Sequence, residues 1–275
     1  MKMRLFKTLA ILSFGLFACS NSNEPIEGDK VADNKKESKM KIEVWSDIMC
    51  PFCYIGKRNY EEAIAKFKHA DKVELIWKSF QLDPSVPHEG ITESSYEYLA
   101  KRKGWTVEQT KEIHVGVVET AKKAGLTYNF DISKVANSFN AHRIIQLAKT
   151  KGLGDQAEEQ FFKSYFTNGK DLNSKADLLE VGKLIGLSEE EINLALTDEK
   201  YANAVRADIQ EASQLQIQGV PFFVMNRKYA VSGAQPADVF LQTIEKAFAE
   251  WQKENPSSPF EVIEGKVCTP DGECK

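Results

Sequence analysis

Two cysteines separated by two residues, Cys50 and Cys53 in "CPFC", stand between a stretch typical of a strand and a stretch typical of a helix. Before them, "KIEVWSD" at 41–47 places Ile42 and Val44 on one face of a predicted strand. After them, apolar residues recur at the spacing of one helical face, at Tyr60, Ala63, Ile64 and Phe67. The pair therefore stands at the N-terminal end of a predicted helix that follows a strand.

This position gives the two cysteines different chemistry. A helix N-terminus stabilises a thiolate through free N–H groups and about half a positive charge. Cys50 is placed where this field is strongest, and Pro51 suits the first turn because it has no N–H to leave unpaired. Cys53 lies one turn further along, where it can attack a disulfide formed at Cys50. We therefore predict Cys50 as nucleophile and Cys53 as resolving thiol; two metal ligands or two small core residues are the alternatives.

Three further strands and a closing helix are predicted from the remaining apolar patterns. "VELIWKSF" at 73–80 is rich in β-branched and aromatic residues and predicts a strand. Far downstream, "PFFVMN" at 221–226 and "KYAVSG" at 228–233 predict a hairpin. The closing helix starts at Pro236, and its apolar face is formed by Phe240, Ile244, Ala247, Phe248 and Trp251.

The segment from 92 to 216 carries start and stop signals for about six helices. Three pairs have the spacing of a capping box: Thr106 with Gln109, Asp155 with Glu158, and Ser188 with Glu191. Glycines suited to end a helix in a left-handed conformation stand at Gly104, Gly125, Gly152 and Gly186. The predicted order is a βαβ unit, a long helical segment, and then a ββα unit.

This order, with these motifs, resembles the DsbA-like thioredoxin-fold oxidoreductases. "CPFC" directly after a strand and "QGVPFFVMN" before the third strand carry the resemblance. "VWSDIMCPFCYIGK" and "NSFNAHR" at 137–143 resemble the FrnE-like branch, and the likeness runs from residue 41 to residue 251. It implies a thiol–disulfide oxidoreductase or disulfide isomerase that acts on protein cysteines, has an unidentified redox partner, and uses no cofactor or metal.

The expected fold class is α/β, a thioredoxin fold with a large all-helical insertion between its βαβ and ββα halves. The thioredoxin-fold domain is predicted at 41–84 and 217–252, the helical insertion at 85–216, and a C-terminal tail at 253–275. The formal net charge of -4 comes from 36 basic and 40 acidic residues without a long like-charge run. That balance gives no electrostatic footprint for nucleic acid, so we expect no nucleic-acid partner.

The resemblance also implies a role for Val220 and Pro221. In thioredoxin folds the proline at this position is cis and packs opposite the active-site cysteines, while the preceding residue's backbone pairs with an extended substrate. We therefore expect Val220 and Pro221 to bind substrate. Phe52 departs from DsbA, which has a histidine between its cysteines, and for that reason we expect a couple less oxidising than that of DsbA.

The N-terminal residues have the pattern of an export signal. Residues 1–18 begin with basic residues and continue as an apolar stretch without acidic residues. "LFAC" resembles the bacterial lipobox, which implies lipidation of Cys19 and attachment to a membrane by a lipid anchor only. The polar residues 19–40 predict a flexible tether. We expect a lipid-anchored protein of the bacterial cell envelope, facing an extracytoplasmic compartment; an unmodified Cys19, or a cytoplasmic product started at Met40, is the alternative.

A second cysteine pair lies near the C-terminus. "CTPDGEC" contains a turn sequence that folds the chain back between Cys268 and Cys274, so the two thiols are predicted to meet. A structural disulfide, a second redox pair that exchanges with Cys50 and Cys53, and a zinc site built from all four cysteines are open alternatives.

Other side chains carry weaker signals. His142 lies on a predicted helix, where a lone histidine is more often structural than functional. Asp47 and Lys57 flank "CPFC", and either can tune proton transfer there. An aromatic run at helical spacing favours core packing, with a roof over the site as the alternative; it comprises Phe161, Phe162, Tyr165 and Phe166.

Two other classes of function remain beside the oxidoreductase. Kappa-class glutathione transferases and hydroxychromene carboxylate isomerases share this fold, but they use a serine at the position of Cys50. A resolving thiol at Cys53 has no task in simple glutathione activation, which argues against that class. A redox-silent or zinc-binding module is the third class.

Overall fold

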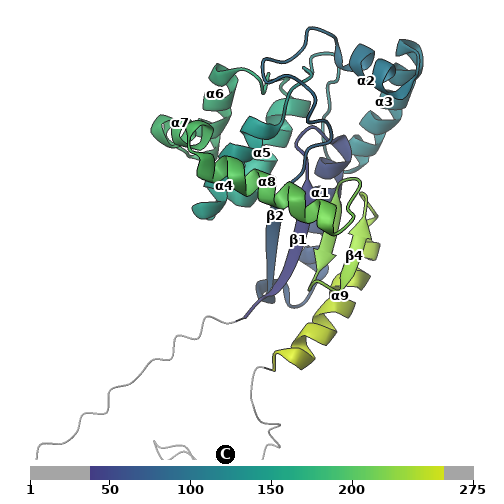
Figure 1. Cartoon of the computed structure of the whole chain (residues 1–275). Helices are drawn as coiled ribbons and strands as arrows, with labels where there is room; N and C mark the ends of the chain where they lie inside the picture. The colour runs from purple at the N-terminus through teal and green to yellow at the C-terminus, as the bar shows by residue number, and fades with distance from the viewer. Residues whose placement is uncertain (1–37, 257–275) are drawn as a thin grey trace, which may run out of the picture. The chain divides into compact units, whose positions relative to one another are not determined.

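Figure 1 shows the chain as a computed structural model, which describes residues 38–256. In this range four strands form one sheet in the order β2-β1-β3-β4. β1 runs parallel to β2 and antiparallel to β3, and β3 and β4 form the predicted hairpin. The strands are β1 (Met40–Ser46), β2 (Val73–Ser79), β3 (Phe222–Met225) and β4 (Tyr229–Ser232). The α/β thioredoxin fold with a helical insertion is confirmed.

Two helices, α1 (Pro51–Lys66) and α9 (Ala237–Glu254), pack against each other over one face of the sheet. Ile42 and Val44 of β1 face this layer and are fully buried, as the alternation predicts. Trp45 points to the opposite face, where it packs against Ala212 of α8 (Glu199–Gln214). β1 is therefore buried on both faces, as expected of a central strand.

Seven helices lie between β2 and β3 in the described part of the chain, one more than the pattern predicts. Figure 1 shows α2 and α3 at one end of this group and α6 and α7 at the other. The last of them, α8, contacts both α4 and β2 and so returns the chain to the sheet. The bounds are α2 (Ser95–Lys103), α3 (Val107–Lys123), α4 (Phe139–Thr150), α5 (Gly154–Phe166), α6 (Lys175–Ile185), α7 (Glu189–Thr197) and α8; a short 3₁₀ turn, η1 (Ala70–Lys72), precedes β2.

Two of the three predicted capping boxes are present, at Thr106 before α3 and at Ser188 before α7. A further capping box at Ser94 starts α2 and was not among those predicted. The box predicted at Asp155 and Glu158 is wrong, because α5 begins at Gly154 and Glu158 points into the protein interior. The four predicted helix-ending glycines all have positive φ, at Gly104, Gly125, Gly152 and Gly186.

The ends of the fold differ slightly from the prediction. Met40, assigned to the tether, is fully buried in β1 and pairs with Val73, and α9 continues two residues beyond the predicted end of the domain at 252. The predicted signal peptide at 1–18, Cys19, and the pair Cys268 and Cys274 lie outside the described residues. Within 38–256, every helix is too short or too polar to cross a membrane.

An ion-pair network joins α1 to α5 of the insertion. Lys57 is 2% exposed and lies 3.2 Å from Asp155 Oδ2 and 3.2 Å from Glu159 Oε2. Arg58 donates to both carboxylate oxygens of Glu159, and the Tyr54 hydroxyl donates to Oε1 over 2.6 Å. A buried ammonium group needs such partners because its desolvation is costly. The network therefore fixes the helix that carries the cysteines against the insertion.

Gly56 allows α1 to approach the start of β3 closely. A Cβ atom at this position would lie 2.9 Å from Pro221 Cγ and 3.6 Å from the ring of Phe223. A proline ring has little freedom to move aside, so the absence of a side chain at Gly56 sets the distance between α1 and Pro221.

We predict that Glu159→Gln lowers the free energy of unfolding at pH 7 by about 1 to 2 kcal/mol, because it removes the charge that holds Arg58 and Lys57. Burial alone would raise the pKa of Glu159, but the hydrogen bonds from Arg58 and Tyr54 and the charge of Lys57 lower it to about 2. Stability from a lowered carboxyl pKa is present above the unfolded value and is lost as pH falls through the folded one. Urea unfolding should therefore show the deficit shrinking below about pH 4.5.

Glu245→Gln on the exposed side of α9 is the matched control and should leave stability unchanged at every pH. A Glu159→Gln deficit that stays constant between pH 7 and pH 3 would contradict this account of the network.

We also predict that Gly56→Ala destabilises the protein by about 1 kcal/mol, because overpacking against Pro221 outweighs the gain in helix propensity. Gly116→Ala in α3 is the control, since a Cβ there meets nothing within 4 Å; it should stabilise by about 0.5 to 1 kcal/mol. Thermal or urea unfolding measures both. Equal stabilisation by the two changes would show that Gly56 does not set the approach to Pro221.

Candidate active site at the start of helix α1

Cys50 is the N-cap residue of α1. Its backbone is extended, with φ -92° and ψ 113°, and Pro51 occupies the first helical position as predicted. The Cys50 N–H donates to the Asp47 carbonyl over 2.8 Å, and the Cys50 carbonyl accepts from the Cys53 N–H over 3.0 Å. The Tyr128 hydroxyl donates to the Pro51 carbonyl over 2.7 Å. The loop is thus held on both sides, by the strand end and by the insertion.

The two cysteines are free thiols that differ in their surroundings. Cys50 is 5% exposed and Cys53 is 1% exposed, so Cys50 is the one nearer the surface. Burial raises the pKa of Cys53 well above its usual value of 9.0, and Cys50 raises it further, whereas the Asp47 backbone and the Ser46 side chain lower it in part. A thiol held protonated in this way needs a proton acceptor before it can act as a nucleophile.

Val220 and Pro221, which are 170 residues away in sequence, lie against the cysteines. The Cys50 thiol donates to the Val220 carbonyl, with 3.4 Å between sulfur and oxygen. The Val220–Pro221 peptide bond is cis, as the resemblance implies. The Pro221 carbonyl accepts from Gly233 N–H over 2.9 Å, which ties this segment to the end of β4. The structure therefore brings together all four residues that the sequence assigns to the site.

Phe52 points outward from the first turn of α1. It is 43% exposed, although large aromatic side chains are usually buried. Of the loop residues before Cys50, Met49 is half-buried and Ile48 is fully buried. An exposed aromatic ring beside Cys50 offers an apolar contact to a molecule that approaches the thiol.

Asp47 and Lys57, the two charged residues that flank the motif, interact with different parts of the structure. The Asp47 carboxylate accepts from the Met49 N–H over 3.1 Å and from the Leu82 N–H over 2.7 Å, so it shapes the cysteine loop. Lys57 instead joins the ion-pair network with α5. Only Asp47 is adjacent to the cysteines.

The aromatic run of α5 packs in the same apolar core as Cys50 and Cys53. Phe162 stacks on Tyr54 with ring centroids 4.9 Å apart, and Tyr165 and Phe166 also line a cavity beside the loop. The aromatic residues of α5 therefore pack in the core, and two of them also line the cavity beside the cysteine loop.

His142, which the sequence favours as a structural histidine, lies next to the cysteine loop. It is fully buried on α4, and its Nε2 lies 3.5 Å from Asp47 Oδ1. The sequence held one signal for this pair: both motifs that resemble the FrnE-like branch contain a member of it. "NSFNAHR" contains His142, and "VWSDIMC" contains Asp47. Helical or strand periodicity relates only residues of one element, so it could not predict this contact between residues that have 94 others between them in the chain.

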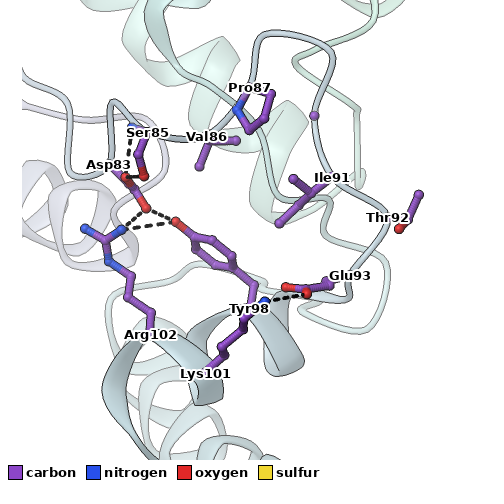
Figure 2. A pocket seen from close by; sticks show the side chains of 11 residues that line it. Asp83, Ser85, Val86, Pro87, Ile91, Thr92, Glu93, Tyr98, Lys101 and Arg102 are labelled. Atoms are coloured by element: carbon purple, nitrogen blue, oxygen red, sulfur yellow. Dashed lines mark hydrogen bonds and ion pairs between the residues drawn. The ribbon is translucent and has the colours of Figure 1, made fainter.

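Two cavities share part of their lining, and one of them borders the cysteine loop. The inner one, about 260 Å³, is lined by Asp47, Met49 and Pro51 together with residues of the insertion. The outer one, about 630 Å³, is shown in Figure 2, where Tyr98 and Arg102 of α2 both point toward Asp83. Asp83 accepts a hydrogen bond from Tyr98 and pairs with Arg102. These three residues line both cavities and therefore form the boundary between them.

Within residues 38–256, no group of three or more histidine, cysteine, aspartate or glutamate side chains has the arrangement of a metal site. The four-cysteine zinc site includes Cys268 and Cys274 and so falls outside this range. The chemistry that the described residues support is that of two thiols, one at a helix N-terminus and one buried behind it.

Comparison with known proteins agrees with this geometry. Residues 41–245 match the family described as DSBA-like thioredoxin domain. The chain is 28% identical over 216 residues to the uncharacterized protein YwbO of Bacillus subtilis (strain 168), across 77% of this chain and 97% of that one. It is similar to the crystal structure of a probable DsbA oxidoreductase from Streptomyces coelicolor, with 36% identity and a TM-score of 0.73, covering 86% of this chain and 98% of that one.

The cytosolic disulfide reductase DsbM from Pseudomonas aeruginosa shares the fold at 13% identity and a TM-score of 0.51, over 78% of this chain and 98% of that protein. The match to the family covers nearly all of β1, the whole of α1, β2, the insertion and the hairpin, and the first half of α9. The chain belongs to the family of DSBA-like thioredoxin domains.

Proposed function

We propose that the protein is a thiol–disulfide oxidoreductase of the FrnE-like branch that acts on the cysteines of other proteins. In the reductive direction Cys50 attacks a substrate disulfide and Cys53 resolves the mixed disulfide, which leaves a Cys50–Cys53 disulfide. In the oxidative direction a substrate thiol attacks Cys50 of that disulfide, Cys53 leaves as a thiolate, and a second substrate thiol resolves the mixed disulfide. The observation that carries the proposal is the contact of the Cys50 thiol with the Val220 carbonyl, 3.4 Å away, at the N-terminus of α1. This contact supports the proposal, because an extended peptide can pair with the backbone segment beside the proposed nucleophile.

The direction of exchange depends on how strongly the thiolate form is favoured. Phe52 supplies no charge or hydrogen bond to a Cys50 thiolate, unlike the histidine of DsbA. The proposed couple is therefore less oxidising than that of DsbA, which suits reduction or isomerisation of disulfides better than strong oxidation. The exposed ring of Phe52 and the half-buried Val220 together give an apolar surface for an unfolded polypeptide.

We further propose that the protein works in the bacterial cell envelope, attached by lipid at Cys19. The apolar leader and the "LFAC" motif support this, since a lipid anchor with a polar tether keeps an enzyme at a membrane without a spanning helix. In the oxidising environment outside the cytoplasm, Cys268 and Cys274 form a second disulfide, or exchange electrons with Cys50 and Cys53.

A glutathione-dependent transferase or isomerase is the principal alternative on this fold. The buried second thiol, Cys53, argues against it, because glutathione activation needs one hydrogen-bonding group at the helix start and no resolving cysteine.

We predict that Cys53→Ser accumulates a mixed disulfide between Cys50 and a protein substrate such as insulin, because the resolving thiol is absent. Cys50→Ser should form none, since the nucleophile is lost. Both variants should lose insulin reduction by more than about 100-fold. Mass spectrometry of the trapped adduct and the turbidity of reduced insulin measure these outcomes.

The control adds Cys268→Ser and Cys274→Ser to the Cys53→Ser variant and should still form the adduct on Cys50. If Cys53→Ser retained full turnover, a resolving thiol would be unnecessary, and the role proposed for Cys53 would fail.

A further inference from the structure

The hydroxyl of Tyr128, in the segment between α3 and α4, reaches the first turn of the cysteine helix. It donates to the Pro51 carbonyl over 2.7 Å, although the two residues are 77 positions apart in the chain. Tyr128 is buried, and its ring stacks on Phe166 of α5 with centroids 4.6 Å apart and on Tyr54 of α1 with centroids 6.2 Å apart. The packing of the ring therefore determines where the hydroxyl points.

The Pro51 carbonyl belongs to the same peptide unit as the Phe52 N–H. Pro51 is the first residue of α1, so Phe52 is the second, and N–H groups in the first turn of a helix have no partner within the helix. The Cys53 N–H donates to the Cys50 carbonyl over 3.0 Å, whereas the Phe52 N–H has no hydrogen-bond partner among residues 38–256. The Phe52 N–H is therefore an open donor beside Cys50.

Cys50, as the N-cap residue, is placed to use this donor when it ionises. An N-cap side chain accepts a hydrogen bond from the second or third N–H of its helix. In the structure the Cys50 side chain makes no capping hydrogen bond, and its thiol donates to the Val220 carbonyl instead. A thiolate has no proton to donate to that carbonyl, so it loses this hydrogen bond and needs a donor. The Phe52 N–H can supply it.

The hydrogen bond from Tyr128 strengthens the Phe52 N–H as a donor. Hydrogen bonds that follow one another through a peptide unit polarise each other. A donor on the Pro51 carbonyl draws electron density from the peptide nitrogen, so the N–H on the other side of the unit becomes more positive. The hydroxyl, the peptide unit and the sulfur therefore form one chain of hydrogen bonds once Cys50 is a thiolate.

Tyr128 keeps its own proton in this chain. Burial raises the pKa of Tyr128 well above its usual value of 10.0, and the charges of Cys50, Tyr54 and Cys53 raise it further, whereas the charge of Arg58 lowers it in part. The hydroxyl therefore stays a donor when Cys50 ionises.

We propose that Tyr128 is a positioning residue for the Cys50 thiolate, because its hydroxyl polarises the peptide unit whose N–H, that of Phe52, donates to the sulfur. The inference rests on the proposed function, since it concerns the form of Cys50 that attacks. The thiol proton passes to solvent when Cys50 ionises. The thiolate then bonds to one sulfur of a disulfide, and the other sulfur leaves with the electron pair as a thiolate. Tyr128 neither gives nor takes a proton in this step.

A purely structural role predicts a different result. If the Tyr128 hydroxyl only joined the insertion to α1, its removal would change access to Cys50, and so the rate of attack, by the same factor at every pH. A group that stabilises the thiolate instead matters where Cys50 is still partly protonated. Its loss is compensated when the solution becomes basic enough to ionise all of the thiol.

The test measures how fast iodoacetamide alkylates Cys50 as pH is raised. The thiolate displaces iodide, and mass spectrometry of peptides distinguishes alkylation at Cys50 from alkylation at Cys53. The full-length chain is used with three other cysteines replaced by serine, namely Cys19, Cys268 and Cys274. We expect Tyr128→Phe to slow alkylation about three- to tenfold on the acidic side of the profile and to reach the parent rate at high pH. The equilibrium with glutathione should shift towards the Cys50–Cys53 disulfide, because the reduced form loses stabilisation.

Tyr96→Phe in α2 is the matched control. It also removes a tyrosine hydroxyl of the insertion, but that hydroxyl donates to Asp131 over 2.9 Å and not to the cysteine loop, so the alkylation profile should stay as in the parent chain. A Tyr128→Phe profile equal to that of the parent, or lowered by the same factor at all pH values, would overturn the inference. A parent chain that forms no Cys50–Cys53 disulfide with glutathione would instead reject the proposed function, so the two failures are distinct.

Replacing Tyr128 by 3-fluorotyrosine gives a second test that keeps the ring and the hydroxyl, in case Tyr128→Phe does not fold. Fluorine makes the phenol a stronger donor to the Pro51 carbonyl, so the alkylation profile should move to lower pH, opposite to the effect of Tyr128→Phe. The stacking on Phe166 is retained, so a change in packing does not produce this shift. A profile that stays in place or moves to higher pH would also overturn the inference.

Discussion

The structure depends on the contact between the start of α1 and the Val220–Pro221 segment. Cys50 ends a loop that leaves β1, while Val220 precedes β3, and the antiparallel pairing of these two neighbouring strands brings the residues together. Gly56 sets how closely the helix approaches Pro221. The pairing of β1 with β3 determines which residues lie opposite each other, and Gly56 determines how far α1 lies from Pro221. The geometry of the site therefore follows from the central strands rather than from a flexible loop.

The insertion does more than enlarge the fold. Through Lys57 and Arg58 its helix α5 is joined to α1, and through Tyr128 it holds the first turn. It also supplies the buried groups His142 and Glu158 behind the thiols. The topology of a thioredoxin fold determines where the cysteine helix starts relative to the sheet. In this protein the insertion supplies residues that surround Cys53. The insertion thus forms part of the apolar core in which both thiols are buried.

The parts that the sequence predicted are those that depend on local chemistry. The alternation in β1, the helical face of α1 and the capping boxes at Thr106 and Ser188 each follow from neighbouring residues. Cys50 and Cys53 were found from their position at the start of a predicted helix, and Pro221 was found because its motif resembles a family. His142 and Glu158 were not, because their meaning comes from partners on other elements; Glu158 even has the spacing of a cap, but its burial overrides that local signal.

The most direct measurement of the central claim is the reduction potential of the Cys50–Cys53 pair, obtained by equilibrating the protein with glutathione buffers and quantifying the disulfide by mass spectrometry. The account predicts a reversible two-electron couple with a potential more negative than about -120 mV, the value of DsbA, and above about -300 mV. A potential below about -300 mV, or no disulfide between the two cysteines, would show a structural or silent pair and would contradict the account. A value as high as that of DsbA would contradict the role assigned to Phe52.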